Sequence, residues 1–65
     1  MRTTYALYAR TRDTREWVMC WNFDDEATAR WLATRRGDVG DIRLVKHWYE
    51  GDSLVQTEEL ETYNH

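Results

Sequence analysis

Two histidines and one cysteine are the residues of this chain best suited to nucleophilic or acid–base chemistry. His65 lies in a polar C-terminal segment, whereas Cys20 and His47 fall in segments with strand-like alternation. Alternation places Cys20 and His47 on the same face of a sheet, so a Cys–His pair is geometrically conceivable. A catalytic pair also needs an orienting third group and a cleft that excludes water, and the sequence indicates neither. We therefore expect no enzymatic activity.

Metal and nucleotide sites have characteristic residue spacings, and this sequence contains none of them. A single cysteine cannot form an internal disulfide, and no other residue stands at zinc-ligand spacing from it. The acidic run Asp24-Asp25-Glu26 lacks the spaced ligands of a calcium loop, so we interpret it as the acidic start of a helix. We expect neither a metal ion nor a cofactor.

Residues 16–32 carry the clearest structural signal, because their pattern changes from that of a strand to that of a helix. Segment 17–23 has a large apolar side chain at every second position, and successive side chains of a strand point to opposite faces. Four side chains are therefore expected to form an aromatic row on one face: Trp17, Met19, Trp21 and Phe23.

A helix is expected to follow this strand, N-capped by Asp24 or Asp25 and ended by Gly37 in the left-handed conformation. Spacings of three and four residues predict which side chains share its inner face: Ala27, Thr28, Trp31, Leu32 and Arg35. We expect Trp31 and Leu32 to press onto the aromatic row.

Three further strands are predicted from β-branched and aromatic residues without breakers: 3–11, 42–49 and 54–57. The first forms an antiparallel hairpin with the aromatic strand, with Tyr5, Leu7 and Ala9 beside the row. The fold class is α+β in the order β-β-α-β-β, a small antiparallel sheet with one amphipathic helix packed on one face. The predicted core consists of Tyr5, Leu7, Trp17, Met19, Trp21, Phe23, Trp31, Leu32, Ile42, Leu44 and Trp48.

The 65 residues are expected to form a single domain, 1–65, with an ordered core of about 3–57. Residues 58–65 are acidic and are expected to fray, although Leu60 and Tyr63 could dock. The N-terminal residues contain no apolar run that resembles a signal peptide or a membrane span. The cytoplasm is therefore the expected location.

One helix covers only one face of a sheet, and the other face is predicted to be unusually apolar for contact with water. It would carry Tyr8, Arg10, Arg12, Val18, Cys20, Asn22, Arg43, Val45, His47 and Tyr49. Contiguous aromatic, aliphatic and arginine side chains are typical of binding surfaces. Two other interpretations stay open, namely that the C-terminal segment folds over this face, or that it is an ordinary mixed sheet face.

Two kinds of partner compete for this face. Aromatic and arginine side chains on a sheet suggest nucleic acid, because rings stack on bases and arginine contacts phosphate. The net charge of −3, with −5 concentrated in residues 37–65, opposes that interpretation and favours a protein partner. The acids of the C-terminal segment could meet a basic groove. The candidate partner-binding residues are Tyr8, Arg10, Arg12, Arg43, Val45, His47, Tyr49, Glu58 and Glu59.

The layout of residues 5–49 resembles that of several small phage-encoded inhibitors, such as the RNA polymerase inhibitor of T7-like phages and some anti-CRISPR proteins. The shared parts are the 3–23 hairpin, the acidic-capped helix that starts Asp24-Asp25-Glu26-Ala27, and the 42–49 strand. This resemblance in size and element order implies a non-enzymatic protein that covers a functional site on a host complex, such as a CRISPR effector or the transcription machinery. The alternatives are a small nucleic-acid-binding protein, or a homodimer through the same face or an edge strand.

Overall fold

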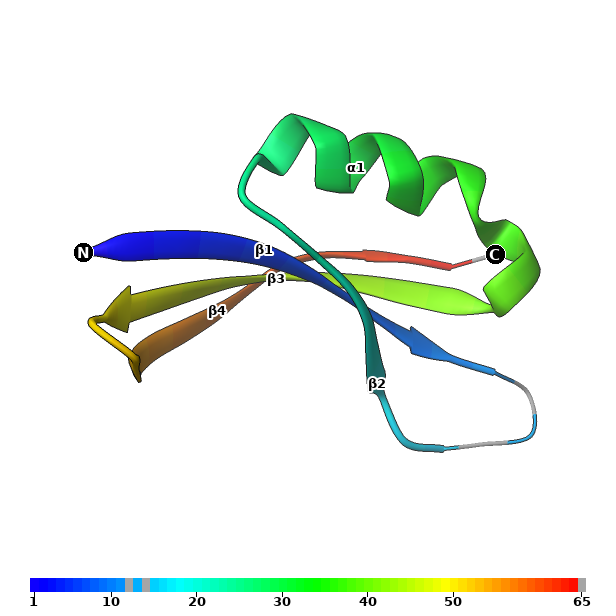
Figure 1. Ribbon diagram of the computed structural model, residues 1–65. Coiled ribbons are helices and arrows are strands. Elements are labelled where there is room, and N and C mark those ends of the chain that lie inside the picture. The colour runs from blue at the N-terminus through cyan, green and yellow to red at the C-terminus, as the bar shows by residue number, and fades with distance from the viewer. Residues whose placement is uncertain (12, 14, 65) are drawn as a thin grey trace.

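Four antiparallel strands and one helix make up the fold, in the predicted order β-β-α-β-β and in the predicted α+β class. The computed structural model describes residues 1–11, 13 and 15–64. Its elements are β1 (Arg2–Arg10), β2 (Val18–Phe23), α1 (Glu26–Arg35), the 3-10 turn η1 (Gly37–Val39), β3 (Asp41–Glu50) and β4 (Ser53–Tyr63). The strand order across the sheet is β2-β1-β3-β4, and α1 lies across one face of it (Figure 1).

The fourth strand is longer than the sequence pattern indicates. Residues 58–63 were expected to fray, but they continue β4, whose last pair joins Tyr63 to Ile42 of β3. Leu60 and Tyr63 pack against the core, and the Arg30 guanidinium of α1 binds both the Glu61 carboxylate and the Tyr63 hydroxyl. These contacts hold the acidic segment in the sheet, so it does not fold over the second face.

A β-bulge divides the expected aromatic row. Leu7 pairs with Trp21, but the next residue of β1, Tyr8, pairs with Met19, so Cys20 is the extra residue of β2. A bulge shifts the alternation of side chains by one position. Trp21 and Phe23 therefore face the helix, whereas Trp17 and Met19 lie on the opposite face. The prediction of one continuous row is wrong for these two residues.

The core lies between the helix and the sheet. Five side chains of its centre are fully buried: Leu7, Ala29, Ala33, Ile42 and Leu44. Seven others pack partly against them: Tyr5, Trp21, Phe23, Leu32, Val39, Leu60 and Tyr63. Most of the predicted core is confirmed, but Met19 and Trp31 are about half exposed, at 51% and 56%, and Trp17 and Trp48 lie outside this cluster.

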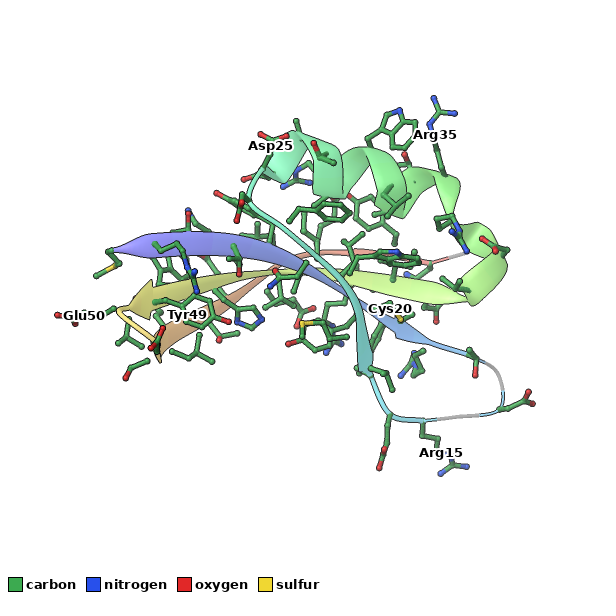
Figure 2. The ribbon with its side chains drawn as sticks, viewed as in Figure 1. Arg15, Cys20, Asp25, Arg35, Tyr49 and Glu50 are labelled. Carbon is green, nitrogen blue, oxygen red and sulfur yellow. The ribbon has the colours of Figure 1, made fainter. Side chains whose placement is uncertain are left out.

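The helix presents alanines to the sheet. Ala29 and Ala33 lie one turn apart and have no exposed surface, which lets the helix backbone approach the strands closely. The predicted inner face is therefore rotated, and Trp31 points to solvent, where the Arg35 guanidinium lies 4.6 Å from its ring centroid. Figure 2 shows Arg35 on the side of the helix away from the sheet.

Both ends of the helix have identifiable causes. The Asp25 carboxylate accepts hydrogen bonds from the Thr28 backbone N–H and hydroxyl, both at 2.8 Å, and these bonds lower the pKa of Asp25. At the other end Gly37 does not take the left-handed conformation that we predicted, because the chain continues into η1. Gly40 has the positive φ, 99°, and a Cβ there would meet the Arg10 carbonyl oxygen at 2.5 Å.

Candidate functional site

The face of the sheet without the helix contains a hollow of about 250 Å³. Seven residues line it: Tyr8, Trp17, Arg43, Val45, His47, Thr57 and Glu59. They come from β1, β3, β4 and the residue before β2, so the hollow spans the width of the sheet. Bulges in β2 and β4 bend the two edge strands, as bulges generally do, and these are the strands that carry the walls.

The floor of the hollow is buried, and its histidine has hydrogen-bond partners on both ring nitrogens. Val45 and His47 are each only 6% exposed, although no helix covers them. The His47 ring nitrogens both have hydroxyl partners, Nε2 with Tyr8 at 3.1 Å and Nδ1 with Thr57 at 2.9 Å. These two hydrogen bonds fix the orientation of the imidazole in the floor of the hollow.

The Cys20–His47 pair that the alternation makes conceivable has no geometric support. Cys20 is the bulge residue on the outer strand and is not among the lining residues. Its thiol is exposed and donates a hydrogen bond to the Val18 carbonyl oxygen at 3.5 Å. Cys20 therefore contributes no thiol to the hollow.

The two arginines at the hollow each lie beside a carboxylate of the same chain. The Arg43 Nε lies 3.3 Å from a Glu59 carboxylate oxygen, and the Arg10 guanidinium lies 3.4 Å from Asp41. Both guanidinium groups also lie over the ring of Trp17, at 4.1 Å for Arg43 and 4.7 Å for Arg10. The mouth is thus an indole held between two arginines, each already beside a carboxylate.

One donor on the wall lacks a well-aligned acceptor. The Arg43 Nε–H is buried and forms no hydrogen bond within the described chain, because the nearby Glu59 oxygen is close but poorly aligned. An N–H group left in this state gains free energy when an acceptor reaches it. A carbonyl oxygen of a ligand could supply that acceptor if the Arg43 or Glu59 side chain moved to expose the Nε–H.

Five of the nine predicted binding residues line the hollow: Tyr8, Arg43, Val45, His47 and Glu59. Arg10 stands at its rim on Trp17. Tyr49 lies farther along β3, its ring 6.3 Å from that of His47 and covered by Arg2. Glu58 pairs across the strands with Lys46 on the helix face, so it does not belong to this surface, and Arg12 lies outside the described residues.

Two lining residues were missed by the sequence reasoning. Trp17 was assigned to the core because the alternation from Trp17 to Phe23 is unbroken in the sequence, and nothing in it marks the bulge at Cys20. Thr57 was placed in the fourth strand but not paired with a residue of β3. The register that sets Thr57 opposite His47 depends on a second bulge, between Trp48 and Tyr49.

Comparisons with known proteins supply no further evidence on this site. The chain matches no family model, no similar curated protein and no similar solved structure. Within the described residues, no three histidine, cysteine or acidic side chains are grouped so that they could hold a metal ion. Nor does any described helix have the length and apolar character needed to cross a membrane.

Proposed function

We propose that this chain is a non-enzymatic protein-binding module whose hollow receives an uncharged apolar side chain of a protein partner. The observation that carries the proposal is the combination of apolar and aromatic walls with charges that already have internal partners. An apolar side chain placed on Val45 and between the rings of Tyr8 and Trp17 would lose its contact with water without stranding a charge.

The state of the arginines favours protein over nucleic acid. Binding to nucleic acid needs protein cations that can approach the phosphate backbone and displace its counterions. Arg10 and Arg43 are each beside a carboxylate and stacked on Trp17, so a phosphate would have to displace those contacts. The net charge of −3 adds repulsion.

The buried Arg43 Nε–H narrows the class of partner further. A peptide chain that inserts a side chain also brings a backbone carbonyl, which can accept this hydrogen bond. The proposal therefore combines one apolar anchor with one carbonyl from the same partner segment.

Blocking is the mode of action that belongs to this proposal. The resemblance to phage-encoded inhibitors implies a domain that covers a functional site on a host complex, and an apolar hollow with aromatic walls suits a protein that anchors itself on such a surface. A cytoplasmic setting is part of the same proposal.

The test uses a probe with the proposed chemistry, N-acetyl-tryptophan amide, which carries an apolar ring and two amide carbonyls. We expect this probe to bind saturably with a dissociation constant in the millimolar range, as measured by heteronuclear NMR. Trp17→Ser should abolish it, whereas Trp31→Ser, which removes an exposed tryptophan from the helix, should leave it unchanged. Equal loss in both variants would contradict the proposal.

A second titration addresses the alternative partner. A single-stranded oligonucleotide should not bind at low salt, because the arginines of this face are occupied. Binding that falls steeply with salt and is lost in Arg43→Ala would replace the protein-binding proposal with the nucleic-acid one.

A further inference from the structure

The two edges of the sheet differ in how they are protected against pairing with another strand. The order β2-β1-β3-β4 leaves β2 and β4 each with a neighbour on one side only. Edge strands are commonly protected by charged side chains. β4 carries Glu58, Glu59 and Glu61, whereas β2 has no charged residue along its whole length, Val18–Phe23.

The β2 edge is also apolar where it meets solvent. Val18 is 54% exposed, Met19 is 51% exposed, and the Cys20 side chain is exposed as well. The outward backbone N–H and C=O groups of such a strand have only water as a partner, and a second strand can replace that water. β2 is therefore the edge without charged side chains, although it is short and carries a bulge at Cys20.

Opposite charges flank this edge. Arg15 precedes β2 and Asp24 follows it, and both are exposed. Within residues 1–11, 13 and 15–64, neither of them forms an ion pair. Figure 2 shows Arg15 near one end of the strand, Cys20 along it and Asp25 beyond the other end.

We propose that two copies of this chain pair edge to edge through β2, in antiparallel orientation, with Arg15 of each copy beside Asp24 of the other. Antiparallel pairing brings the start of one strand beside the end of its copy, so the register that matches these charges places the twofold axis between Met19 and Cys20. The ion pair then forms twice, once on each side of the axis.

Pairing of two β2 edges is more favourable than the other edge pairings between two copies. Pairing of two β4 edges would bring glutamates of one copy toward those of the next, which is destabilising. Pairing of β2 with β4 of another copy leaves one edge open at each end and would continue into a fibre. Only the β2–β2 pairing closes after two copies and brings opposite charges together.

In the proposed dimer the two hollows lie on the same surface. A twofold axis perpendicular to the sheet keeps both helices on one face and both hollows on the other. Two hollows on one surface could engage two apolar anchors of a partner at once, which raises the overall affinity without any new contact. This consequence rests on the proposed function, but the dimer itself does not.

The dimer is expected to be weak. A six-residue strand with a bulge at Cys20 can offer only a short ladder, and interfaces of this size belong to the low end of specific contacts. We expect monomers at about 10 µM and dimers at about 1 mM, which corresponds to a modest association free energy.

Sedimentation equilibrium over this concentration range tests the proposal, with a reductant present so that Cys20 forms no disulfide. Arg15→Asp and Asp24→Arg should each weaken the dimer at least about tenfold, because each change creates two repulsive contacts. The double variant should restore the affinity to within about threefold. Additive losses in the double variant would overturn the assigned register.

A matched pair of variants separates the two edges. Met19→Lys places a charge on β2, and Leu54→Lys places the same charge at an equally exposed position on β4, 52% against 51%. We expect Met19→Lys to give a monomer at all concentrations and Leu54→Lys to dimerise as the wild type does. A wild-type monomer at 1 mM, or a dimer broken by Leu54→Lys alone, would overturn the proposal, and either result would leave the single-hollow probe assay unaffected.

Discussion

The two faces of the sheet are built from the same strands but have different contents. On the helix face Leu7, Ile42 and Leu44 are fully buried beneath Ala29 and Ala33. On the other face the buried residues of β1 and β3 include polar ones, Thr4 and His47. The apolar face is covered by a helix, whereas the mixed face has no helix over it and holds His47 in place by hydrogen bonds with Tyr8 and Thr57.

This difference suggests that the helix face mainly stabilises the fold, whereas the helix-free face is available for binding. A face that buries only apolar side chains stabilises the fold by excluding water. A face with a hydrogen-bonded histidine, stacked arginines and a hollow contributes less apolar burial and leaves room for a ligand. Mutations on the two faces should therefore have different consequences for stability and for binding.

Leu44→Ala should have the largest effect on stability. It removes a side chain with no exposed surface from the helix face, and such changes cost about 2–5 kcal/mol. A urea titration should show that Trp17→Ala, at the mouth of the hollow, costs much less while removing probe binding. Similar losses of stability from both substitutions would contradict the separation of the two faces.

Thr57→Val should cost about 1–3 kcal/mol of unfolding free energy, because it leaves Nδ1 of the buried His47 ring without its hydroxyl partner. Thr34→Val on the helix is a suitable control, since the Thr34 hydroxyl only donates to the exposed Trp31 carbonyl. Thermal unfolding of both variants measures the difference. Equal melting temperatures would indicate that water replaces the hydroxyl at His47.

Arg30→Gln should cost about 1 kcal/mol, because Arg30 joins the helix to the end of β4 through Glu61 and Tyr63. Its hydrogen bond with Glu26 raises the pKa of Arg30, and burial raises the pKa of Tyr63. Amide exchange should accelerate in residues 60–63 more than in β1. Uniform acceleration would mean that Arg30 does not hold this segment.

Acid should weaken the helix through its cap. The pKa of Asp25 is lower in the folded chain than its ordinary value of 3.8, so its contribution to stability is present above that value and is lost as the pH falls through the folded pKa. Urea midpoints should therefore fall in the wild type as the pH drops below the ordinary Asp pKa of 3.8, and less so in Asp25→Asn, whose amide oxygen can still cap. An identical acid profile in both proteins would assign the loss to other carboxylates, such as Asp38.

Much of the fold follows from local patterns. The turn signal at Gly51, the capping acid at Asp25 and the alternation in residues 42–49 each have one short-range physical cause, and each appears in the structure as expected. The arrangement of the helix face was less predictable. Small alanines decided it, because close packing of the helix backbone outweighed burial of the large Trp31 side chain.

The hollow was predictable in part. Alternation along β1 and β3 placed Tyr8, Val45 and His47 on one face, and the structure brings them together. The position of Trp17 was not predictable, because a bulge depends on how two strands fit and leaves no mark on the alternation of either. The length of β4 was underestimated for a different reason: Glu59 and Glu61 are paired with Arg43 of β3 and Arg30 of α1, which lie far away in the sequence.

On our proposal the helix-free face is open to an apolar ligand, whereas the helix covers the other face. Two valines report on the two faces, Val45 in the floor of the hollow and Val39 against the core. In a methyl NMR titration with N-acetyl-tryptophan amide, the account predicts that the Val45 methyl signals shift in a saturable way while those of Val39 stay in place. Unchanged Val45 signals at probe saturation, or equal shifts at both valines, would contradict it.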